Sequence, residues 1–512
     1  MSTRSERFLL TLAWLLLGLR LVSIVLMPLT DTSEPRYAEI ARLMATSGDW
    51  ITPWFSPGTP FWGKPPLSFW AQAGFIQAFG LAEWTSRLPS WLVAAATVWI
   101  LHALARQTVG RLAAAWASLI YVTCALPYLA AGAVLTDPYL ALGTTLAMAG
   151  LRLPGWRWRL AGALGLAIGL LAKGPLVLVL AGVPALLTRL IHGPAAWPRL
   201  SGRLALGLGG LVAVLVVPWY VLAEWKTPGF LDYFVVGEHV RRFLDPGWSG
   251  DLYGTAHQRP YGSIWWHALQ ATLPWGLVAL GALVAALVRP DGRAAMRRAL
   301  RQADTGYWLI WALVPLAFFT LSGNVLWTYT LPAIAPLAIL LGQVAARWSH
   351  AEPAPSAGQA TAPQRRSDRP TRRDLALAGL ATLVPAAALL ASLVAWQQPE
   401  RVKTERPLLR AVQTLAGPDA PLWYVNTLPF SARYYSEGRA MTISLHDAVA
   451  LYDAQGIPAY LAIAPDDLAQ WPANVPVERL PQGDSKRYAL VRLPVSPAAV
   501  AAAVATRSPQ GS

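Results

Sequence analysis

The chain has 512 residues, of which 55% are hydrophobic and 13% charged, and its mean hydropathy is +0.39. Soluble proteins carry about 25% charged residues, so this composition excludes an ordinary soluble domain and indicates a membrane protein. The 42 Lys and Arg residues exceed the 27 Asp and Glu residues, but the excess lies mostly in short loops between apolar segments. There it orients membrane helices, which argues against nucleic-acid binding.

The apolar runs predict a polytopic helical protein with about 11–13 membrane spans, since about 20 apolar residues cross a bilayer. The first run follows Arg4 and Arg7 and is too long for a secretory signal, so we interpret it as a retained helix. The predicted spans lie near 8–28, 88–105, 112–130, 134–151, 157–172, 175–191, 203–224, 265–288, 305–321, 327–346 and 374–396.

Arginines occur at alternate loops between these spans. They group at Arg4 and Arg7, Arg106 and Arg111, Arg152 to Arg159, Arg189 to Arg203, Arg289 to Arg301, and Arg347 to Arg373. Because positively charged loops stay in the cytoplasm, these loops are predicted to be cytoplasmic and the C-terminus external. The single cysteine, Cys124, excludes an intramolecular disulfide and a metal–thiolate cluster.

Three regions stand apart from the spans. Residues 29–87 form a long first external loop, and loops of this length are usually functional. Residues 347–373 include a Pro/Ala/Arg-rich stretch that predicts a cytoplasmic linker loop. Residues 397–512 are less apolar and predict a small external α/β domain, with strand-like runs at Leu422–Val425, Met441–Ser444, Ala459–Ile463 and Tyr488–Leu493.

The first external loop carries two carboxylates, Asp31 and Glu34, directly after the first span. Pro35 suits a first helical turn, and residues 35–47 predict a short amphipathic helix on the membrane surface. The two carboxylates then lie at the positive end of that helix. Taken alone, they are better explained as a helix cap with solvated charges than as a catalytic site.

Further polar residues follow in the other loops that are predicted to be external. Lys64 lies between aromatic residues and a Pro-Pro pair; it can merely extend to the interface, or it can bind a lipid phosphate. The remaining ones are Asp137, Lys173, Glu238, His239, Arg242 and Tyr329. Because all of them face outward in this topology, they favour a single external active site near the bilayer surface.

Together these residues resemble the GT-C class of membrane glycosyltransferases, and within it the aminoarabinose transferase branch that is related to protein O-mannosyltransferases. The resemblance covers residues 8–345. Its motifs are Glu34-x-Arg36-Tyr37-Ala38-Glu39-Ile40, Gly48-Asp49-Trp50, Lys64-Pro65, Asp137-Pro138, Lys173-Gly174, Glu238-His239, Arg242-Phe243 and Tyr329.

The resemblance implies a transmembrane glycosyltransferase domain over residues 1–396 and a periplasmic soluble domain over 397–512. The catalytic Asp of the family usually precedes the Glu directly, where this chain has Ser33, so Asp31 is our first candidate for the base and Glu34 the second. The family's metal-site Glu before the loop lysine is replaced by Gly63, which predicts no zinc there. Asn324 stands where the aminoarabinose enzymes carry lysine, which can indicate a different sugar.

The activity that the resemblance implies is transfer of a sugar, aminoarabinose or another pentose or hexose, from a polyprenyl-phosphate donor to a periplasmic lipid or glycan such as lipid A. Lys64 and Arg242 would neutralise the donor phosphate, with Arg36 and His239 as helpers. Asp31 would deprotonate the acceptor, and attack opposite the phosphate would invert the anomeric centre. Tyr37, Asp137, Lys173, Glu238 and Tyr329 are predicted to support the site or contact substrate.

Other functions remain open at this point. A protein acceptor would make the chain a protein O-glycosyltransferase of the same class. A transporter should show repeated halves with polar or broken helices at the midplane, and no such halves are apparent. A membrane assembly factor would use the external domain for docking. The resemblance implies no firm cofactor and leaves metal dependence open, with the protein in a bacterial inner membrane.

Overall fold

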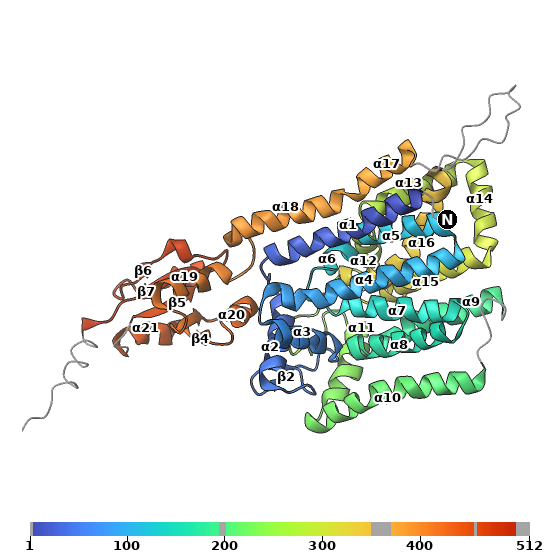
Figure 1. Ribbon diagram of the computed structural model, residues 1–512. Helices are drawn as coiled ribbons and strands as arrows, with labels where there is room; N and C mark the ends of the chain where they lie inside the picture. The colour runs from blue at the N-terminus through green and yellow to red at the C-terminus, as the bar shows by residue number, and fades with distance from the viewer. Residues whose placement is uncertain (1–3, 194–200, 350–369, 455–457, 498–512) are drawn as a thin grey trace, which may run out of the picture. The chain divides into compact units, whose positions relative to one another are not determined.

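The computed structural model (Figure 1) describes residues 4–193, 201–349, 370–454 and 458–497. The chain divides into two compact units, each with its own contacts. The first comprises Met1–Ile24 and Met44–Leu389, and the second comprises Val25–Leu43 and Leu390–Ser512. The beginning of the loop that was predicted to be external therefore folds with the C-terminal residues, a division that the sequence did not suggest.

The first unit is built from helices and one small hairpin, β1 (Trp54–Ser56) with β2 (Thr59–Pro60). Its main α-helices are α1 (Arg4–Leu26), α3 (Leu67–Phe79), α4 (Glu83–Thr108), α5 (Arg111–Thr123), α6 (Ala125–Ala130), α7 (Asp137–Arg152), α8 (Trp156–Lys173), α9 (Leu176–His192), α10 (Gly202–Lys226), α12 (Ser263–Ala271), α13 (Trp275–Val288), α14 (Pro290–Arg301), α15 (Ala303–Thr320), α16 (Leu331–Ser349) and α17 (Arg372–Ala381). It also contains the π-helix η2 (Asp232–Arg241), the one-turn helix α11 (Arg242–Leu244) and the 3-10 helix η3 (Trp327–Thr330). Helix α18 (Leu383–Gln397) begins in this unit and continues into the second.

Every predicted span coincides with a helix or with a pair of consecutive helices. The predicted run 112–130 is interrupted at Cys124, and the run 265–288 bends by 111° between α12 and α13. Pro274 lies at that bend, where its missing N–H cannot continue a helix. Five described helices, or six with the bent pair, are long and apolar enough to cross a membrane. The larger number of spans stays a prediction.

Helices α7 and α8 form an antiparallel hairpin in which glycines bring the two backbones together (Figure 1). A Cβ on Gly143 would lie 2.6 Å from the carbonyl oxygen of Gly165, and one on Gly150 would lie 2.6 Å from the Cα of Gly162. Small residues permit this approach, as is common between membrane helices. The hairpin places the start of α7 beside the end of α8.

The second unit contains a mixed five-stranded sheet of order β4-β3-β5-β7-β6. Strand β3 is parallel to β4 and β5, whereas β7 is antiparallel to β5 and β6. The strands are β3 (Leu422–Val425), β4 (Met441–Ile443), β5 (Ala459–Ile463), β6 (Glu478–Arg479) and β7 (Ala489–Leu493). The predicted strands are confirmed to within a residue, and β6 is added to them.

Helices cover both faces of this sheet. Along β5, Tyr460 and Ala462 pack with Leu408 on one face, while Leu461 and Ile463 pack on the other. This alternation follows from the period of two along a strand, and the two-sided burial explains why β5 is apolar throughout. The helices of this unit are α19 (Arg406–Ala416), α20 (Phe430–Tyr435), α21 (Leu445–Ala454) and α22 (Pro465–Leu468), with the short 3-10 turns η4 (Pro399–Arg401) and η5 (Pro481–Gly483).

Two predictions about loops have different outcomes. The predicted interfacial helix is present as α2 (Ser33–Ser47), which begins two residues earlier than the predicted residues 35–47. Most of the predicted linker loop 347–373 lies outside the described residues, which end at Ser349 and resume at residue 370.

The arginine pattern predicts which loops a reagent outside the cell can reach. Cysteines introduced at the exposed positions Thr59 and Glu478 should react with a membrane-impermeant maleimide in intact spheroplasts. A cysteine at Ala294, on the exposed surface of α14, should react only after permeabilisation. The native Cys124 is buried and gives little background. The opposite labelling pattern would overturn the predicted sidedness.

Candidate functional site

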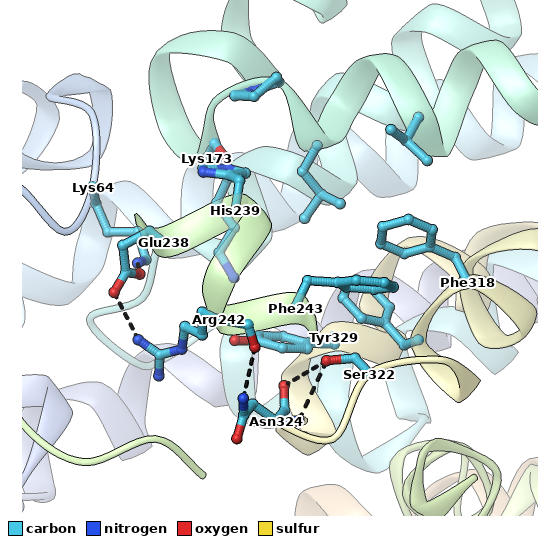
Figure 2. Close-up of a pocket in the computed structure, with 14 residues that line it drawn as sticks. Lys64, Lys173, Glu238, His239, Arg242, Phe243, Phe318, Ser322, Asn324 and Tyr329 are labelled. Carbon is cyan, nitrogen blue, oxygen red and sulfur yellow. Dashed lines mark hydrogen bonds and ion pairs between the residues drawn. The ribbon is translucent and has the colours of Figure 1, made fainter. Parts of the chain in front are cut away.

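A pocket of about 190 Å³ in the first unit is lined by residues from five separate segments (Figure 2). Lys64 comes from the loop that follows β2, and Lys173 is the last residue of α8. Glu238 and His239 come from the π-helix η2, and Arg242 begins α11. The pocket also includes Tyr329 of η3, Ser322, Asn324 and an apolar wall of Pro175, Leu176, Val179, Phe243, Phe318 and Phe319.

Glu238 is the central charge of this pocket. Its carboxylate is 5% exposed and accepts hydrogen bonds from Lys64 Nζ at 3.0 Å and from Arg242 at 2.8 Å. Arg242 also pairs with Asp251 at 3.1 Å. Glu238 and Arg242 are four residues apart, a spacing that brings their side chains to one side of a helical segment.

The charges around Glu238 control its protonation. Burial alone would raise the pKa of Glu238, but the positive charges of Lys64 and Arg242 lower it to about 2. Burial opposes the charge of Arg242 as well, yet Tyr329, Glu238 and Asp251 raise the pKa of Arg242 above its ordinary value. Glu238 therefore holds two cations and cannot serve as a proton donor near neutral pH.

The loop that carries Lys64 is fixed by Tyr253. The Tyr253 hydroxyl donates to the carbonyl oxygen of Pro60 at 2.8 Å and accepts from the Trp62 amide at 2.9 Å. Its ring packs against Phe61, with the ring centroids 4.6 Å apart. Burial raises the pKa of Tyr253 to about 12, so this hydroxyl stays protonated and keeps both hydrogen bonds.

A second ion pair closes the end of the α7–α8 hairpin. Lys173 Nζ lies 2.7 Å from a carboxylate oxygen of Asp137, and both side chains are about 90% buried, with 8% and 10% exposed. The same ammonium lies 4.8 Å from the centroid of the Tyr329 ring, within the range of a cation–π contact. The predicted role of Asp137, support of the site, stays a prediction, and this ion pair is consistent with it.

His239 connects η2 to the end of α8. Its Nδ1 lies 2.7 Å from the Phe234 carbonyl oxygen, and its Nε2 lies 3.0 Å from the Lys173 carbonyl oxygen. Burial lowers the pKa of His239, although both carbonyls favour the charged form. A neutral ring can donate to only one of them.

The residue after Lys173 must be glycine. Gly174 has φ 73°, and a Cβ there would lie 2.7 Å from the Phe234 ring, so the close approach of the α8 end to η2 requires glycine.

Asn324 fastens the segment that carries Arg242. Its amide nitrogen donates to the carbonyl oxygen of Arg242 (Figure 2) and to that of Asp245. Its amide oxygen accepts from the Gly247 backbone at 2.9 Å. All three bonds go to backbone groups, so the side chain of Asn324 is occupied in holding this loop. The sequence did not predict this role.

Asp31, the first candidate for the base, belongs to the second unit. Its side chain is 3% exposed, and it accepts hydrogen bonds from the Ser431 amide, the Ser431 hydroxyl and the Arg487 guanidinium. Its own backbone N–H donates to the Lys403 carbonyl oxygen at 2.8 Å. The C-terminal residues therefore define both its backbone and its carboxylate.

The other predicted residues of the first loop lie on α2. Glu34 is in the first turn, and Tyr37 is buried. The Arg36 guanidinium lies 5.2 Å from the centroid of the Tyr37 ring and 5.7 Å from that of Phe430. These residues, like Asp31, belong to the second unit, whereas Lys64, Asp137, Lys173, Glu238, His239, Arg242 and Tyr329 all come together in the first.

The remaining question about the predicted site concerns metal-ligating side chains. Among the residues that the structure describes, no three His, Cys, Asp or Glu side chains are grouped closely enough to hold one. At Gly63, a Cβ would lie 2.8 Å from the Phe61 ring, so a ligating side chain cannot be added there without moving that ring. The prediction of no zinc at this position stays a prediction.

Sequence reasoning missed several residues that shape these sites. Asp251 and Tyr253 follow the Glu238–Arg242 segment closely, and their polar and aromatic character next to it was an available signal. Ser431 and Arg487 carried none, because nothing in their local sequence relates them to Asp31.

Residues 6–234 match the family model described as dolichyl-phosphate-mannose-protein mannosyltransferase. The chain is 33% identical over 366 residues to the undecaprenyl phosphate-alpha-4-amino-4-deoxy-L-arabinose arabinosyl transferase 1 of Pseudomonas fluorescens, which covers 65% of this chain and 58% of that protein. It is 32% identical over 335 residues to such a transferase of Pseudomonas aeruginosa, covering 60% of this chain and 54% of that protein. The chain thus spans little more than half the length of these curated relatives.

The fold is similar to that of ArnT from Cupriavidus metallidurans, whose crystal structure contains bound undecaprenyl phosphate. The TM-score is 0.71 at 20% sequence identity, and the match covers 96% of this chain and 98% of that one. The resemblance to aminoarabinose transferases is borne out by the similarity to the curated relatives. The mainly helical fold with a small C-terminal sheet is confirmed by the structural similarity. The chain is a multi-pass membrane protein.

The Glu238 ion pairs predict a specific dependence of stability on pH. Because the pKa of Glu238 is lowered from 4.5 to about 2, its contribution to stability is complete above about pH 4.5 and is lost as the pH falls toward 2. Glu238→Gln removes the carboxylate that Lys64 and Arg242 share, and breaking such a buried pair should cost about 3–5 kcal/mol. We expect a lower unfolding temperature in detergent at neutral pH, and a smaller further decrease on acidification than in the wild type.

Glu478→Gln is the matched control, because this carboxylate is 58% exposed and pairs with Arg492 at 3.4 Å. Exposed pairs contribute about 0–1 kcal/mol, so its unfolding temperature should stay close to that of the wild type. Equal stability of the two variants at pH 7 would show that Glu238 does not hold the pocket together.

Proposed function

We propose that this protein is an inverting glycosyltransferase that moves a sugar from a polyprenyl-phosphate donor to an acceptor on the periplasmic face of a bacterial inner membrane. The observation that carries the proposal is the pocket of the first unit, which combines the cations Lys64, Lys173 and Arg242 with an apolar wall. A polyprenyl phosphate has the matching chemistry, an anionic headgroup joined to a hydrocarbon chain. The names of the curated relatives support undecaprenyl phosphate as the carrier.

Electrostatic stabilisation of the leaving phosphate is the main contribution that we assign to the pocket. In the donor the phosphate is a diester with one negative charge, and in the product it is a monoester whose second ionisation lies near pH 6. Negative charge therefore grows on the phosphate as the bond to the anomeric carbon breaks. Lys64 and Arg242, fixed by Glu238, would stabilise this growing charge more than the donor itself, which is how a preorganised site increases the rate.

The supporting residues have narrower proposed roles. Lys173, held between Asp137 and Tyr329, is proposed to add positive charge at the donor headgroup. His239 is proposed to assist by fixing the end of α8 against η2. Arg36 and Tyr37 remain proposed contacts of the substrate on α2.

The acceptor hydroxyl needs a base, and we propose Asp31 for that role, with Glu34 as the alternative. The acceptor oxygen would form a bond to the anomeric carbon while its proton passes to the carboxylate. The bond from the anomeric carbon to the phosphate oxygen would break, and its electron pair would leave with the phosphate. Attack from the side opposite the phosphate inverts the anomeric configuration.

The acceptor is proposed to be lipid A or another envelope glycolipid or glycan. A protein acceptor is the second candidate, because the family model that matches residues 6–234 is described by a protein mannosyltransferase activity. Both acceptors use the same donor chemistry, so the pocket does not distinguish them.

The direct test uses the purified full-length chain with undecaprenyl phosphate 4-amino-4-deoxy-L-arabinose and an extract of envelope lipids. Release of undecaprenyl phosphate together with a lipid heavier by one sugar would support the proposal, and NMR of the product should show the inverted anomer. Glycosylated envelope protein in place of lipid would favour the second candidate. Failure to consume this donor, or donors with other sugars, would overturn the proposed activity.

Lys64→Ala should weaken binding of the donor phosphate. A hydrogen bond to a charged group contributes about 1.5–3 kcal/mol, which corresponds to roughly a 10- to 100-fold loss of affinity. The measurement is titration of the detergent-purified protein with undecaprenyl phosphate. Lys226→Ala is the control, because Lys226 is 41% exposed and pairs with Asp49 outside the pocket. Equal affinity of the two variants would remove Lys64 from the proposed phosphate site.

Asp31→Asn keeps the size of the side chain but cannot accept a proton at neutral pH. Since general-base catalysis is typically worth about 10²–10⁴-fold, we expect kcat to decrease by that order while the protein still binds undecaprenyl phosphate. Glu34→Gln should reduce kcat less. If Glu34→Gln is inactive and Asp31→Asn is active, the role of base passes to Glu34.

A further inference from the structure

The Asp31 carboxylate accepts hydrogen bonds in addition to those that anchor the backbone of its loop. The backbone of this segment is already anchored, since Leu29 N–H donates to the Tyr435 hydroxyl at 2.7 Å and Asp31 N–H donates to the Lys403 carbonyl oxygen at 2.8 Å. Ser431 and Arg487 act in addition on the side chain. They determine the direction of the carboxylate, which the backbone anchors leave open.

The hydroxyl of Ser431 can donate in only one direction. Its oxygen accepts the Glu405 backbone N–H at 3.1 Å, so its own hydrogen points to Asp31 Oδ2, to which it donates. The Ser431 backbone N–H donates to the other oxygen, Oδ1, at 2.9 Å. One residue therefore holds both oxygens of the carboxylate and fixes the orientation of its plane.

Arg487 joins Asp31 to a second buried carboxylate. One of its guanidinium nitrogens donates to Asp31 Oδ2 and also, at 2.8 Å, to Glu405, whose side chain is fully buried. Tyr424 O–H donates to Glu405 as well, at 3.4 Å. Because the two carboxylates would repel each other, the shared guanidinium is what allows both to be buried.

These contacts leave one acceptor position on the Asp31 carboxylate for a further hydrogen. Among the described residues, Oδ2 accepts from Ser431 and from Arg487, whereas Oδ1 accepts only from the Ser431 amide. A carboxylate oxygen has two acceptor positions, so Oδ1 retains one. The network thus holds the carboxylate rigidly and leaves one oxygen able to take a proton.

We propose that Arg487 and Ser431 are positioning residues for Asp31, so that the C-terminal domain takes part in the transfer reaction by orienting the base. The inference rests on the proposed function. It goes beyond that function by giving the C-terminal domain a role in the chemical step, in addition to its own folding.

A double-mutant cycle tests this inference. If Arg487 acts through Asp31, Arg487→Gln should lower kcat about 10²-fold, the order expected when a reacting group is misplaced by about 1 Å, with little change in the KM for the donor. In the Asp31→Asn background the same substitution should lower kcat no further, because the group that it positions is already lost. Ser431→Ala should behave in the same way with a smaller effect.

Stability must be measured beside activity, because Arg487→Gln leaves Glu405 buried without its cation. Arg487→Lys keeps the charge but not the planar fork, and it should restore folding and part of kcat. Arg492→Gln is the matched control on the same domain, since Arg492 pairs only with the exposed Glu478 among the described residues. If Arg487→Gln does not fold, the Ser431→Ala cycle decides.

Two results would overturn the inference. The first is a lower unfolding temperature with unchanged kcat per folded molecule in the Arg487 and Ser431 variants, which would reduce the network to a structural anchor. The second is a full additional loss of kcat in the double variant. Both presuppose an active wild type, whereas a wild-type protein that transfers no sugar would contradict the proposed function itself.

Discussion

The buried carboxylate of Glu238 is the interaction on which the pocket depends. It holds Lys64, from the loop that follows β2, beside Arg242, from a segment far along the chain. Two neighbouring cations repel each other in a poorly solvated site, and the carboxylate between them offsets this repulsion. Tyr253, Asn324 and the close approach at Gly174 then fix the segments that carry these charges.

The cations of the pocket are paired with carboxylates. Lys64 and Arg242 share Glu238, Arg242 also pairs with Asp251, and Lys173 pairs with Asp137. Burying an unpaired cation would cost several kcal/mol, roughly the penalty for removing one partner of a buried pair. Under the proposed function, a phosphate in the pocket would therefore join a network of paired charges, and its stabilisation would come from the charge that develops during transfer.

Local sequence patterns were sufficient to predict the helices and strands of the fold. Apolar runs gave the helices, and the strands β3 and β5 were predicted with the observed bounds, because hydrophobic periodicity is a property of short segments. Contacts between segments far apart in the sequence could not be predicted from such local patterns. The breaks at Cys124 and before Pro274, the π-helix of Glu238, and the assignment of residues 25–43 to the second unit depend on packing between distant segments. Clustering of the pocket residues was predicted from their common sidedness, but the bonds of Asp31 to Ser431 and Arg487 were not.

The charged groups of the pocket are set by their surroundings. Glu238 stays ionised down to about pH 2, the pKa of Arg242 is raised, and burial lowers the pKa of His239. These directions favour a charged Glu238–Arg242 pair and a neutral His239 ring near neutral pH. Under the proposed function, the cations of the first unit would stabilise charge on the phosphate, and the candidate base Asp31 would accept the proton of the acceptor. Electrostatic stabilisation and proton transfer would then be carried by different groups, so a substitution at one need not change the protonation of the other.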